Sequence, residues 1–300
     1  MIPPRRIILS GGGIKVVSLV GALKVLEQKG FLKKANEVCG VSAGAFLGFL
    51  LATGISLKQI ETLVLDLDFS IIRNLKPEGF LEFPERFGID DGTQFVKFLE
   101  SIFRVVLKVD PHLTFLEFAA LKRKGQLNFR CWATDLNTYT IREFSLKVTP
   151  SVRIIDALRA SMALPLYFTP SIDPLTGHML TDGGIQGNLP LHHLTEDECN
   201  ESISLGFSSG SLKSVDGVMP QDLTGFINSI FSCLVHSRNE EQLKKWSHRI
   251  LKISVDEYPS WNFEASREDR IMLLSKGSES ALKWSNHTAF TRIIERRYSL

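Results

Sequence analysis

Apolar and polar positions alternate along the chain with two periodicities, one typical of strands and one of helices. Residues 6–10 form a short β-branched run, and residues 18–29 then carry apolar side chains at helical spacing up to Gly30. A second strand is expected over residues 37–39, followed by a helix over residues 43–52 that is apolar on almost every side. The pattern therefore predicts strand, glycine loop and helix, followed at once by strand, tight turn and helix.

Local signals place most of the later elements. Ser56 with Gln59 and Thr114 with Glu117 have the spacing of capping boxes, which mark helix starts. The further helices that we expect cover residues 56–67, 91–107, 114–125, 149–160 and 222–249 and the charged carboxyl-terminal end. The further strands that we expect cover residues 127–134, 138–145, 167–172, 178–181, 202–207 and 250–255. Strands separated by helices, without a repeat or a linker, predict one α/β domain over residues 1–300 with a mostly parallel sheet.

Composition limits the class of function. The chain has 300 residues, of which 44% are hydrophobic and 23% charged, enough for a sizeable core. A net charge of +2 gives no support to a nucleic-acid partner. The four cysteines lie far apart without zinc-ligand spacing, so we expect no metal site and reduced, buried thiols.

The amino-terminal end and the apolar runs bear on location. Two arginines precede only four strand-like residues, too short a run for a signal peptide. The most apolar stretch, residues 46–52, is far short of a membrane span, and neither end carries a lipidation motif. We expect a cytoplasmic protein, which can still act as a peripheral protein on a membrane surface.

Residues 40–44, Gly-Val-Ser-Ala-Gly, match the G-x-S-x-G pattern of a nucleophile elbow. The serine of an elbow lies at a sharp turn between a strand and a helix, where only small neighbours such as Gly40 and Gly44 fit. The turn directs the Ser42 hydroxyl out of the fold and leaves backbone N–H groups at the helix start, where negative charge is favoured. In a chain with 22 glycines, the same spacing also arises by chance.

Gly11, Gly12 and Gly13 lie at the first junction of strand and helix. Consecutive glycines allow backbone N–H groups to converge on one point, as an oxyanion hole requires. A phosphate-binding loop is an alternative, but the chain lacks both the second half of G-x-G-x-x-G and the Gly-Lys-Ser/Thr ending of a P-loop. A plain tight turn is the other alternative.

A nucleophilic serine needs a base, and the sequence offers two kinds. A triad of the α/β-hydrolase type needs an acid and then a histidine, and His178 and His192 are the most plausible of the seven histidines. Asp182 is the other candidate, because it follows a short strand and precedes Gly183 and Gly184, where a loop can present a carboxylate. An ordinary Asp-Gly turn has the same sequence.

Taken together, these motifs resemble those of the patatin-like phospholipases. The matching segments, in the order of the family, are residues 11–15 (GGGIK), 40–44 (GVSAG), 160–165 (ASMALP), 182–184 (DGG) and 188–190 (NLP). The resemblance covers about residues 6–190 and leaves the helical carboxyl-terminal part unassigned. One departure is Val16, where the family usually has glycine, so the oxyanion loop is expected to differ in shape.

The resemblance implies a three-layer α/β/α fold and a lipid acyl hydrolase with a Ser42–Asp182 dyad and no histidine. Residues 11–13 would hold the oxyanion, and Lys15 would add positive charge. The implied substrates are acyl esters of phospholipids, lysophospholipids or neutral glycerides, without a cofactor; the sequence indicates no protein partner. An exposed aspartate with a pKa of about 3.9 is a weak base, so burial must raise that pKa or shorten the hydrogen bond to the serine. A catalytically silent fold that binds lipid remains open because of Val16.

Residues 69–90 are dense in large apolar side chains without helical or strand periodicity. One interpretation is an irregular segment folded back onto the core. The other is a cap beside the elbow, whose Phe80 and Phe83 touch acyl chains or the bilayer surface. In that case the three basic residues of the segment would meet anionic head groups.

Overall fold

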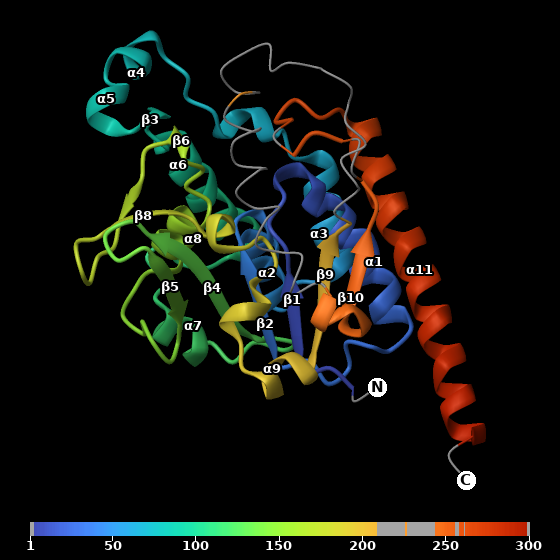
Figure 1. Cartoon of the computed structure of the whole chain (residues 1–300). Coiled ribbons are helices and arrows are strands. Elements are labelled where there is room, and N and C mark those ends of the chain that lie inside the picture. The colour runs from blue at the N-terminus through green and yellow to red at the C-terminus, as the bar shows by residue number, and fades with distance from the viewer. Residues whose placement is uncertain (1–2, 209–225, 227–243, 256–257, 261, 299–300) are drawn as a thin grey trace.

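The computed structural model describes residues 3–208, 226, 244–255, 258–260 and 262–298, with side chains up to residue 286 (Figure 1). The helix expected over residues 222–249 lies largely outside these ranges. Its last part is described as a short 3-10 helix, η6 (Ser247–Arg249).

An eight-stranded sheet forms the centre of the molecule (Figure 1). Its strands are β1 (Arg6–Leu9), β2 (Glu37–Val41), β4 (Asn128–Asp135), β5 (Thr140–Ser145), β7 (Ser171–Ile172), β8 (Met179–Asp182), β9 (Ser202–Phe207) and β10 (Ile250–Ile253). Their order is β10-β9-β1-β2-β4-β8-β7, with β5 also paired to β4. The neighbours from β10 to β4 are parallel, and the pairings made by β5, β7 and β8 are antiparallel. A separate parallel pair consists of β3 (Gly88–Asp90) and β6 (Leu166–Phe168).

Helices cover both faces of this sheet. The α-helices are α1 (Val16–Gln28), α2 (Ala43–Ala52), α3 (Leu57–Asp66), α4 (Pro77–Leu81), α5 (Phe83–Arg86), α6 (Thr93–Ser101), α7 (Phe115–Ala120), α8 (Ile154–Ser161), α9 (Glu196–Asn200) and α11 (Arg267–Tyr298). The 3-10 helices besides η6 are η1 (Gly13–Lys15), η2 (Phe69–Ile72), η4 (Gly183–Gln186) and η5 (Pro190–His193), and a π-helix, η3 (Ile102–Leu107), continues α6. None of the helices in the described ranges combines the length and the apolar character needed to cross a bilayer.

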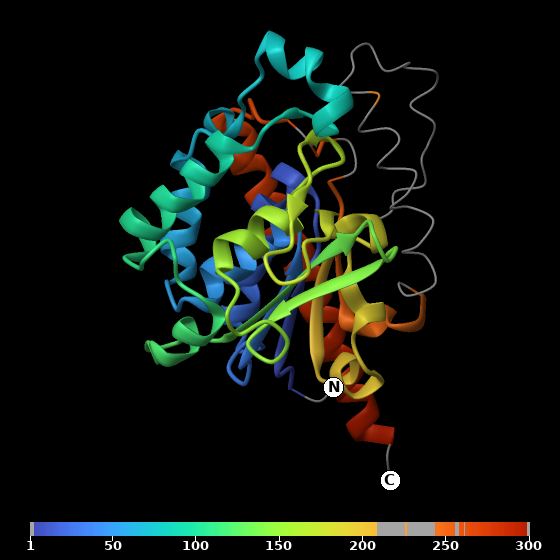
Figure 2. The ribbon, with the colours of Figure 1, turned by 90° about the vertical axis from the view of Figure 1, so that its left-hand side faces the viewer.

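Side-chain alternation along β1 separates the two faces. Ile7 and Leu9 join the larger apolar cluster with α1, α2 and α3, and α11 packs along the outer side of α1 (Figures 1 and 2). Ile8 points to the other face, where it packs with Leu191 and Cys199 from η5 and α9. This arrangement confirms the expected α/β fold with helices on both sides of a mostly parallel sheet.

The helix expected over residues 149–160 begins later, and that part of the prediction was wrong. The backbone before α8 pairs instead with the start of α7 and the residues before it: the Leu116 N–H donates to the Pro150 carbonyl at 2.9 Å, and the Ile154 N–H donates to the Leu113 carbonyl at 2.9 Å. Because these groups are engaged across the chain, they cannot make helical hydrogen bonds, and α8 starts at Ile154.

Two other boundaries differ from expectation. The helix expected to end near residue 125 ends at Ala120, because Lys122 is left-handed (φ 48°) and the Gln126 side chain donates to the Phe118 carbonyl at 2.7 Å. The strand expected over residues 167–172 is split into β6 and β7, which pair with different strands. The expected hairpin is therefore shorter, with only β7 paired to β8.

Candidate active site

Ser42 and Asp182 meet because two strands end head to head along β4. β2 pairs with the first part of β4 and ends with Val41 opposite Trp132, whereas β8 approaches from the other end and finishes with Asp182 opposite Ala133. The two strand ends therefore lie opposite adjacent residues of one neighbour. Side chains 140 residues apart in sequence come within hydrogen-bond distance as a result.

The turn after β2 has the geometry of an elbow. Ser42 has φ 52° and ψ −135°, a backbone conformation that residues other than glycine rarely adopt, and α2 begins at the next residue. A Cβ at Gly40 would lie 2.4 Å from the Gly44 carbonyl oxygen, and a Cβ at Gly44 would lie 2.4 Å from the Ser10 carbonyl oxygen. Both glycines are therefore required for the close approach of strand and helix, as the motif predicts.

The Ser42 hydroxyl donates a hydrogen bond to Asp182 Oδ2 at 2.7 Å, and both side chains are buried. The other carboxylate oxygen accepts the Gly184 N–H at 2.7 Å. Burial raises the pKa of Asp182 to about 7, although the hydrogen bonds from Ser42 and Gly184 act in the opposite direction. A carboxylate with this pKa is a far better proton acceptor near neutral pH than an exposed aspartate.

Ser161 fixes the backbone of the elbow. Its hydroxyl accepts the Ser42 N–H at 2.9 Å and donates to the Trp132 carbonyl at 2.7 Å. In the sequence, the only signal for Ser161 is its position within the motif of residues 160–165. The geometry makes it a positioning residue for Ser42.

The backbone around Asp182 is held just as closely. The Asp182 N–H donates to the Ala163 carbonyl at 2.8 Å, and the Thr134 hydroxyl donates to the Asp182 carbonyl at 2.9 Å. A Cβ at Gly183 would lie 2.3 Å from the Trp132 carbonyl oxygen, so this position also requires glycine.

The three glycines of the loop after β1 differ in their hydrogen bonding. The Gly11 N–H donates to the Asn188 carbonyl at 3.0 Å, whereas the N–H groups of Gly12 and Gly13 make no hydrogen bond within the described part of the chain. Gly13 has φ +55°, and a Cβ there would lie 2.0 Å from the Ser260 carbonyl oxygen. The loop thus leaves two unpaired donors, of which Gly13 lines the same cavity as Ser42, and Gly11 is engaged in holding the loop in place.

An apolar cavity of about 60 Å³ adjoins Ser42. Its lining residues are Gly13, Ile14, Val16, Ser42, Ala43, Phe46, Phe69, Ile72, Phe95, Phe98, Met162, Phe168, Asn262 and Phe263. This volume equals about two water molecules. Val16, the departure from the family pattern, is the first residue of α1 and forms part of the cavity wall. Lys15 is the last residue of η1.

Histidines do not take part in the hydrogen bonds of Ser42 or Asp182 in the described part of the chain. His178 lies at the start of the β8 hairpin, where its Nδ1 is 2.8 Å from Asp135 Oδ2. The His192 ring lies in η5, 3.7 Å from the ring of His193. The described geometry therefore favours the dyad over the triad.

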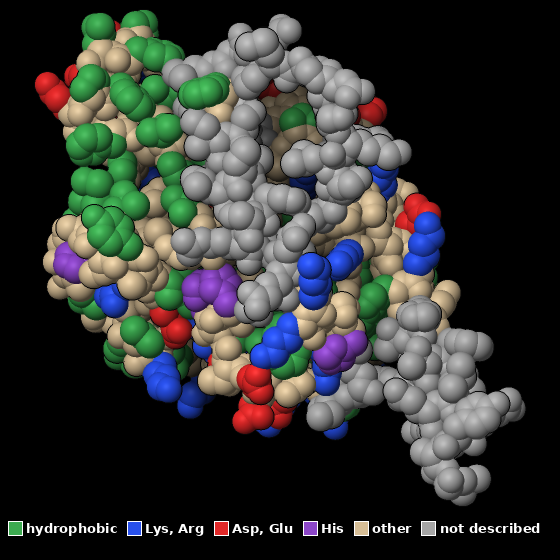
Figure 3. Space-filling model, in the orientation of Figure 1, with side chains coloured by type: hydrophobic (Ala, Val, Ile, Leu, Met, Phe, Trp, Pro, Cys, Tyr) green, Lys and Arg blue, Asp and Glu red, His purple; other side chains and the backbone are tan. Residues whose placement is uncertain are grey.

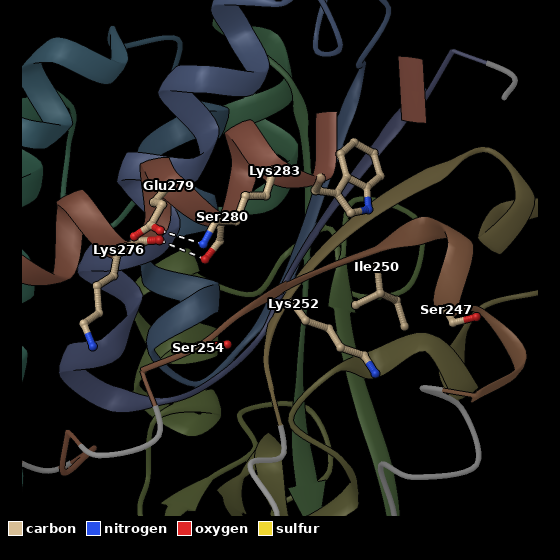
Figure 4. A pocket seen from close by; sticks show the side chains of 9 residues that line it. Ser247, Ile250, Lys252, Ser254, Lys276, Glu279, Ser280 and Lys283 are labelled. Atoms are coloured by element: carbon tan, nitrogen blue, oxygen red, sulfur yellow. Dashed lines mark hydrogen bonds and ion pairs between the residues drawn. The ribbon is translucent and has the colours of Figure 1, made fainter. Parts of the chain in front are cut away.

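A larger, polar pocket of about 610 Å³ lies between β10 and α11 (Figure 4). Lys252 and Lys276 contribute to its lining, together with Lys283, which pairs with Glu279 at 2.6 Å. It shares no lining residue with the apolar cavity at Ser42. Among the described residues, no group of histidine, cysteine, aspartate and glutamate side chains is arranged to hold a metal ion.

Comparison with solved structures supports the fold. VipD from Legionella pneumophila superposes with a TM-score of 0.62 at 16% identity, over 95% of this chain and 67% of VipD. The type III effector protein ExoU superposes with a TM-score of 0.53 at 16% identity, over 95% of this chain and 53% of ExoU.

Comparison of sequences identifies the protein family. The probable lipid hydrolase 463L of Invertebrate iridescent virus 6 is 24% identical over 279 residues, 92% of this chain and 87% of that protein. The human patatin-like phospholipase domain-containing protein 6 is 29% identical over 185 residues, 61% of this chain but 12% of that protein. The family model for patatin-like phospholipases matches residues 7–195, which contain every motif of the site. The chain therefore belongs to the patatin-like phospholipase family.

Proposed function

We propose that this protein is a lipid acyl hydrolase that cleaves carboxylic esters of glycerolipids through Ser42 and Asp182. The observation that carries the proposal is the 2.7 Å hydrogen bond between these two buried side chains at an apolar cavity. The family membership and the relative named as a probable lipid hydrolase support the same class of reaction.

In the first half-reaction, the Ser42 oxygen attacks the ester carbonyl while Asp182 takes the hydroxyl proton. The tetrahedral intermediate then collapses to an acyl-serine, and Asp182 returns the proton to the departing alcohol. In the second half-reaction, Asp182 accepts a proton from water, whose oxygen attacks the acyl-serine. As the fatty acid is released, Asp182 returns this proton to the Ser42 oxygen and the hydroxyl is restored. An aspartate with a pKa of about 7 can serve both as acceptor and as donor near neutral pH.

The N–H groups of Gly12 and Gly13 are the proposed oxyanion donors, because they are unpaired within the described residues. Gly11, expected from the sequence to join them, is not a donor here, since its N–H is already bonded to the Asn188 carbonyl. Lys15, in the same turn, would add positive charge beside the developing oxyanion.

The lining of the cavity supports an acyl chain as the group bound next to Ser42, while its volume of about 60 Å³ encloses only the first carbons of such a chain. Its lining is apolar and rich in phenylalanine, as a hydrocarbon chain requires. Phospholipids and lysophospholipids are the proposed substrates, and the mechanism needs no cofactor.

An alkyl fluorophosphonate tests the nucleophile directly. It should label the protein covalently with one equivalent on Ser42, and Ser42→Ala should lose both the label and on the order of 10³-fold of the lipid hydrolysis. Ser204→Ala is the matched control, because Ser204 is equally buried and lies on β9 outside the cavity. Unlabelled parent protein that binds lipid without cleaving it would instead support a silent, lipid-binding fold.

A further inference from the structure

An exposed apolar surface lies on the segment between α3 and α6. The apolar residues exposed there are Ile71 (50%), Leu75 (37%), Phe80 (51%), Leu81 (81%) and Phe87 (51%), and we call them the apolar tip. α4 and α5 contain no buried residue, and they project from the body of the molecule in both views (Figures 1 and 2). In the space-filling view, hydrophobic side chains gather over the same elements at the upper left (Figure 3).

The same segment also forms part of the cavity at Ser42. Phe69 and Ile72, from η2, line that cavity, while Ile71 between them is exposed. One short stretch of chain therefore has an inner side on the cavity and an outer side in the apolar tip. The segment therefore carries apolar residues both at the cavity and on its exposed side.

Charges in the segment do not favour an anionic surface. Arg73 pairs with Glu264 at 2.9 Å, and Arg86 pairs with Glu82 at 2.8 Å, so two of the three basic residues already have acidic partners. Residues 69–90 also contain four acidic residues, three glutamates and Asp90, against the three basic residues. Attraction to anionic head groups, expected from the sequence, is therefore not supported.

Phe83 differs from Phe80 in its surroundings. It is only partly exposed and packs against the main apolar cluster, whereas Phe80 is half exposed. Phe80 is therefore available for contact with a bilayer, which stays a prediction, whereas Phe83 is unsuitable for testing it.

We propose that the apolar tip docks the protein on a lipid surface, with its side chains inserted among the acyl chains of zwitterionic lipids. A lipid surface is favoured over a protein partner because the tip projects outward and leads by apolar residues to the cavity of the proposed hydrolase. The inference deepens the proposed function by naming where the enzyme meets its aggregated substrate, and it rests on that function.

Vesicle binding tests the proposal without depending on hydrolysis. The Ser42→Ala protein should sediment with phosphatidylcholine vesicles, and adding Phe80→Ser and Leu81→Ser should each weaken its partition coefficient by about tenfold, because each change removes most of one inserted side chain. The matched control is Leu116→Ser, since Leu116 is 60% exposed on α7, away from the apolar tip (Figure 1). It should not change binding.

Two further measurements define which lipid surface the apolar tip binds and whether hydrolysis depends on it. Replacing part of the phosphatidylcholine by phosphatidylserine should change the affinity little, because the segment carries no excess positive charge. In the protein with Ser42 intact, the Phe80→Ser, Leu81→Ser variant should cleave vesicle lipid about 100-fold more slowly at low lipid concentration, but a short water-soluble ester at the parental rate.

Several results would overturn the docking proposal. One is a loss of vesicle binding with Leu116→Ser as large as with the tip variants. Another is an equal loss of hydrolysis on vesicles and on the soluble ester. A third is an unchanged partition coefficient of the tip variants, together with the conversion of a dimer to monomers in sedimentation velocity. The last result would make the apolar tip a contact between copies of this chain. Failure of the proposed function looks different, because a protein that binds vesicles but cleaves neither substrate leaves the docking proposal intact.

Discussion

Replacing Asp182 by asparagine is expected to stabilise the folded protein while removing its activity. Burial raises the pKa of this carboxyl to about 7 in the folded protein, against an ordinary value of 3.8. Between these two pH values the folded chain holds a proton that the unfolded chain has released. Stability therefore falls as the pH rises from about 4 to about 7, and asparagine, which carries no charge, does not share this loss.

The size of the gain follows from the difference in pKa. About 3 units at 1.36 kcal/mol each correspond to about 4 kcal/mol at pH values above both pKa values. Asparagine has the same shape, its oxygen can accept the Gly184 N–H, and its amide can donate to the Ser42 oxygen. With some loss from imperfect geometry, we expect a gain of about 2–4 kcal/mol at pH 8 that shrinks below about 1 kcal/mol at pH 4.

Thermal and urea unfolding of both proteins over this pH range measure the effect. The gain at pH 8 should raise Tm by about 4–8 °C for a chain of this length. Asp68→Asn is the control, because a hydrogen bond from the Ser70 side chain holds the pKa of that exposed carboxyl below its ordinary value. The ionised form of Asp68 stabilises the fold, so this variant should gain nothing at pH 8.

The pH dependence of activity is an independent measure of the ionisation of Asp182. The parental kcat/KM should rise with pH through about 7 as Asp182 loses its proton, and Asp182→Asn should be nearly as inactive as Ser42→Ala. A stability gain that is equal at pH 4 and pH 8, or a loss at pH 8, would refute the raised pKa. Substantial hydrolysis by the asparagine variant would refute the role of Asp182 as the base.

Three further changes separate the roles of neighbouring residues. Ser161→Ala should lower kcat by about 10- to 100-fold with little change in KM, because the backbone N–H of the nucleophile loses its acceptor; the buried control Ser204→Ala should change neither constant. His178→Ala should keep most activity, and a large loss with that variant would favour a triad. Gly13→Ala should lower Tm and activity, since its Cβ would lie 2.0 Å from a carbonyl oxygen, whereas Gly177→Ala, at similar φ with open space around it, should lose only about 1–2 kcal/mol. Equal unfolding midpoints for the two glycine variants would contradict the steric argument.

Elements with a local cause were predictable from the sequence. α2 has the expected bounds, since a glycine turn and an unbroken apolar run specify it without outside contacts. The capping boxes at Ser56 and Thr114 form as expected, because each needs only side chains three residues apart. The start of α8 was predicted wrongly, because a hydrogen bond from Leu116, in the first turn of α7, occupies the carbonyl of Pro150.

In the candidate active site, too, some features have a local cause and others depend on contacts between distant segments. Local motifs made Ser42 and Asp182 candidates, and the resemblance to the patatin-like phospholipases favoured Asp182 over the histidines as the base. Only the tertiary structure decided that they meet, because this depends on β2 and β8 ending opposite adjacent residues of β4. Burial, which raises the pKa of Asp182, and the cavity wall contributed by Phe263 likewise arise from contacts between distant segments. A sequence pattern within a few residues records strand ends and turns, but not which strand lies beside which or how deeply a side chain is enclosed.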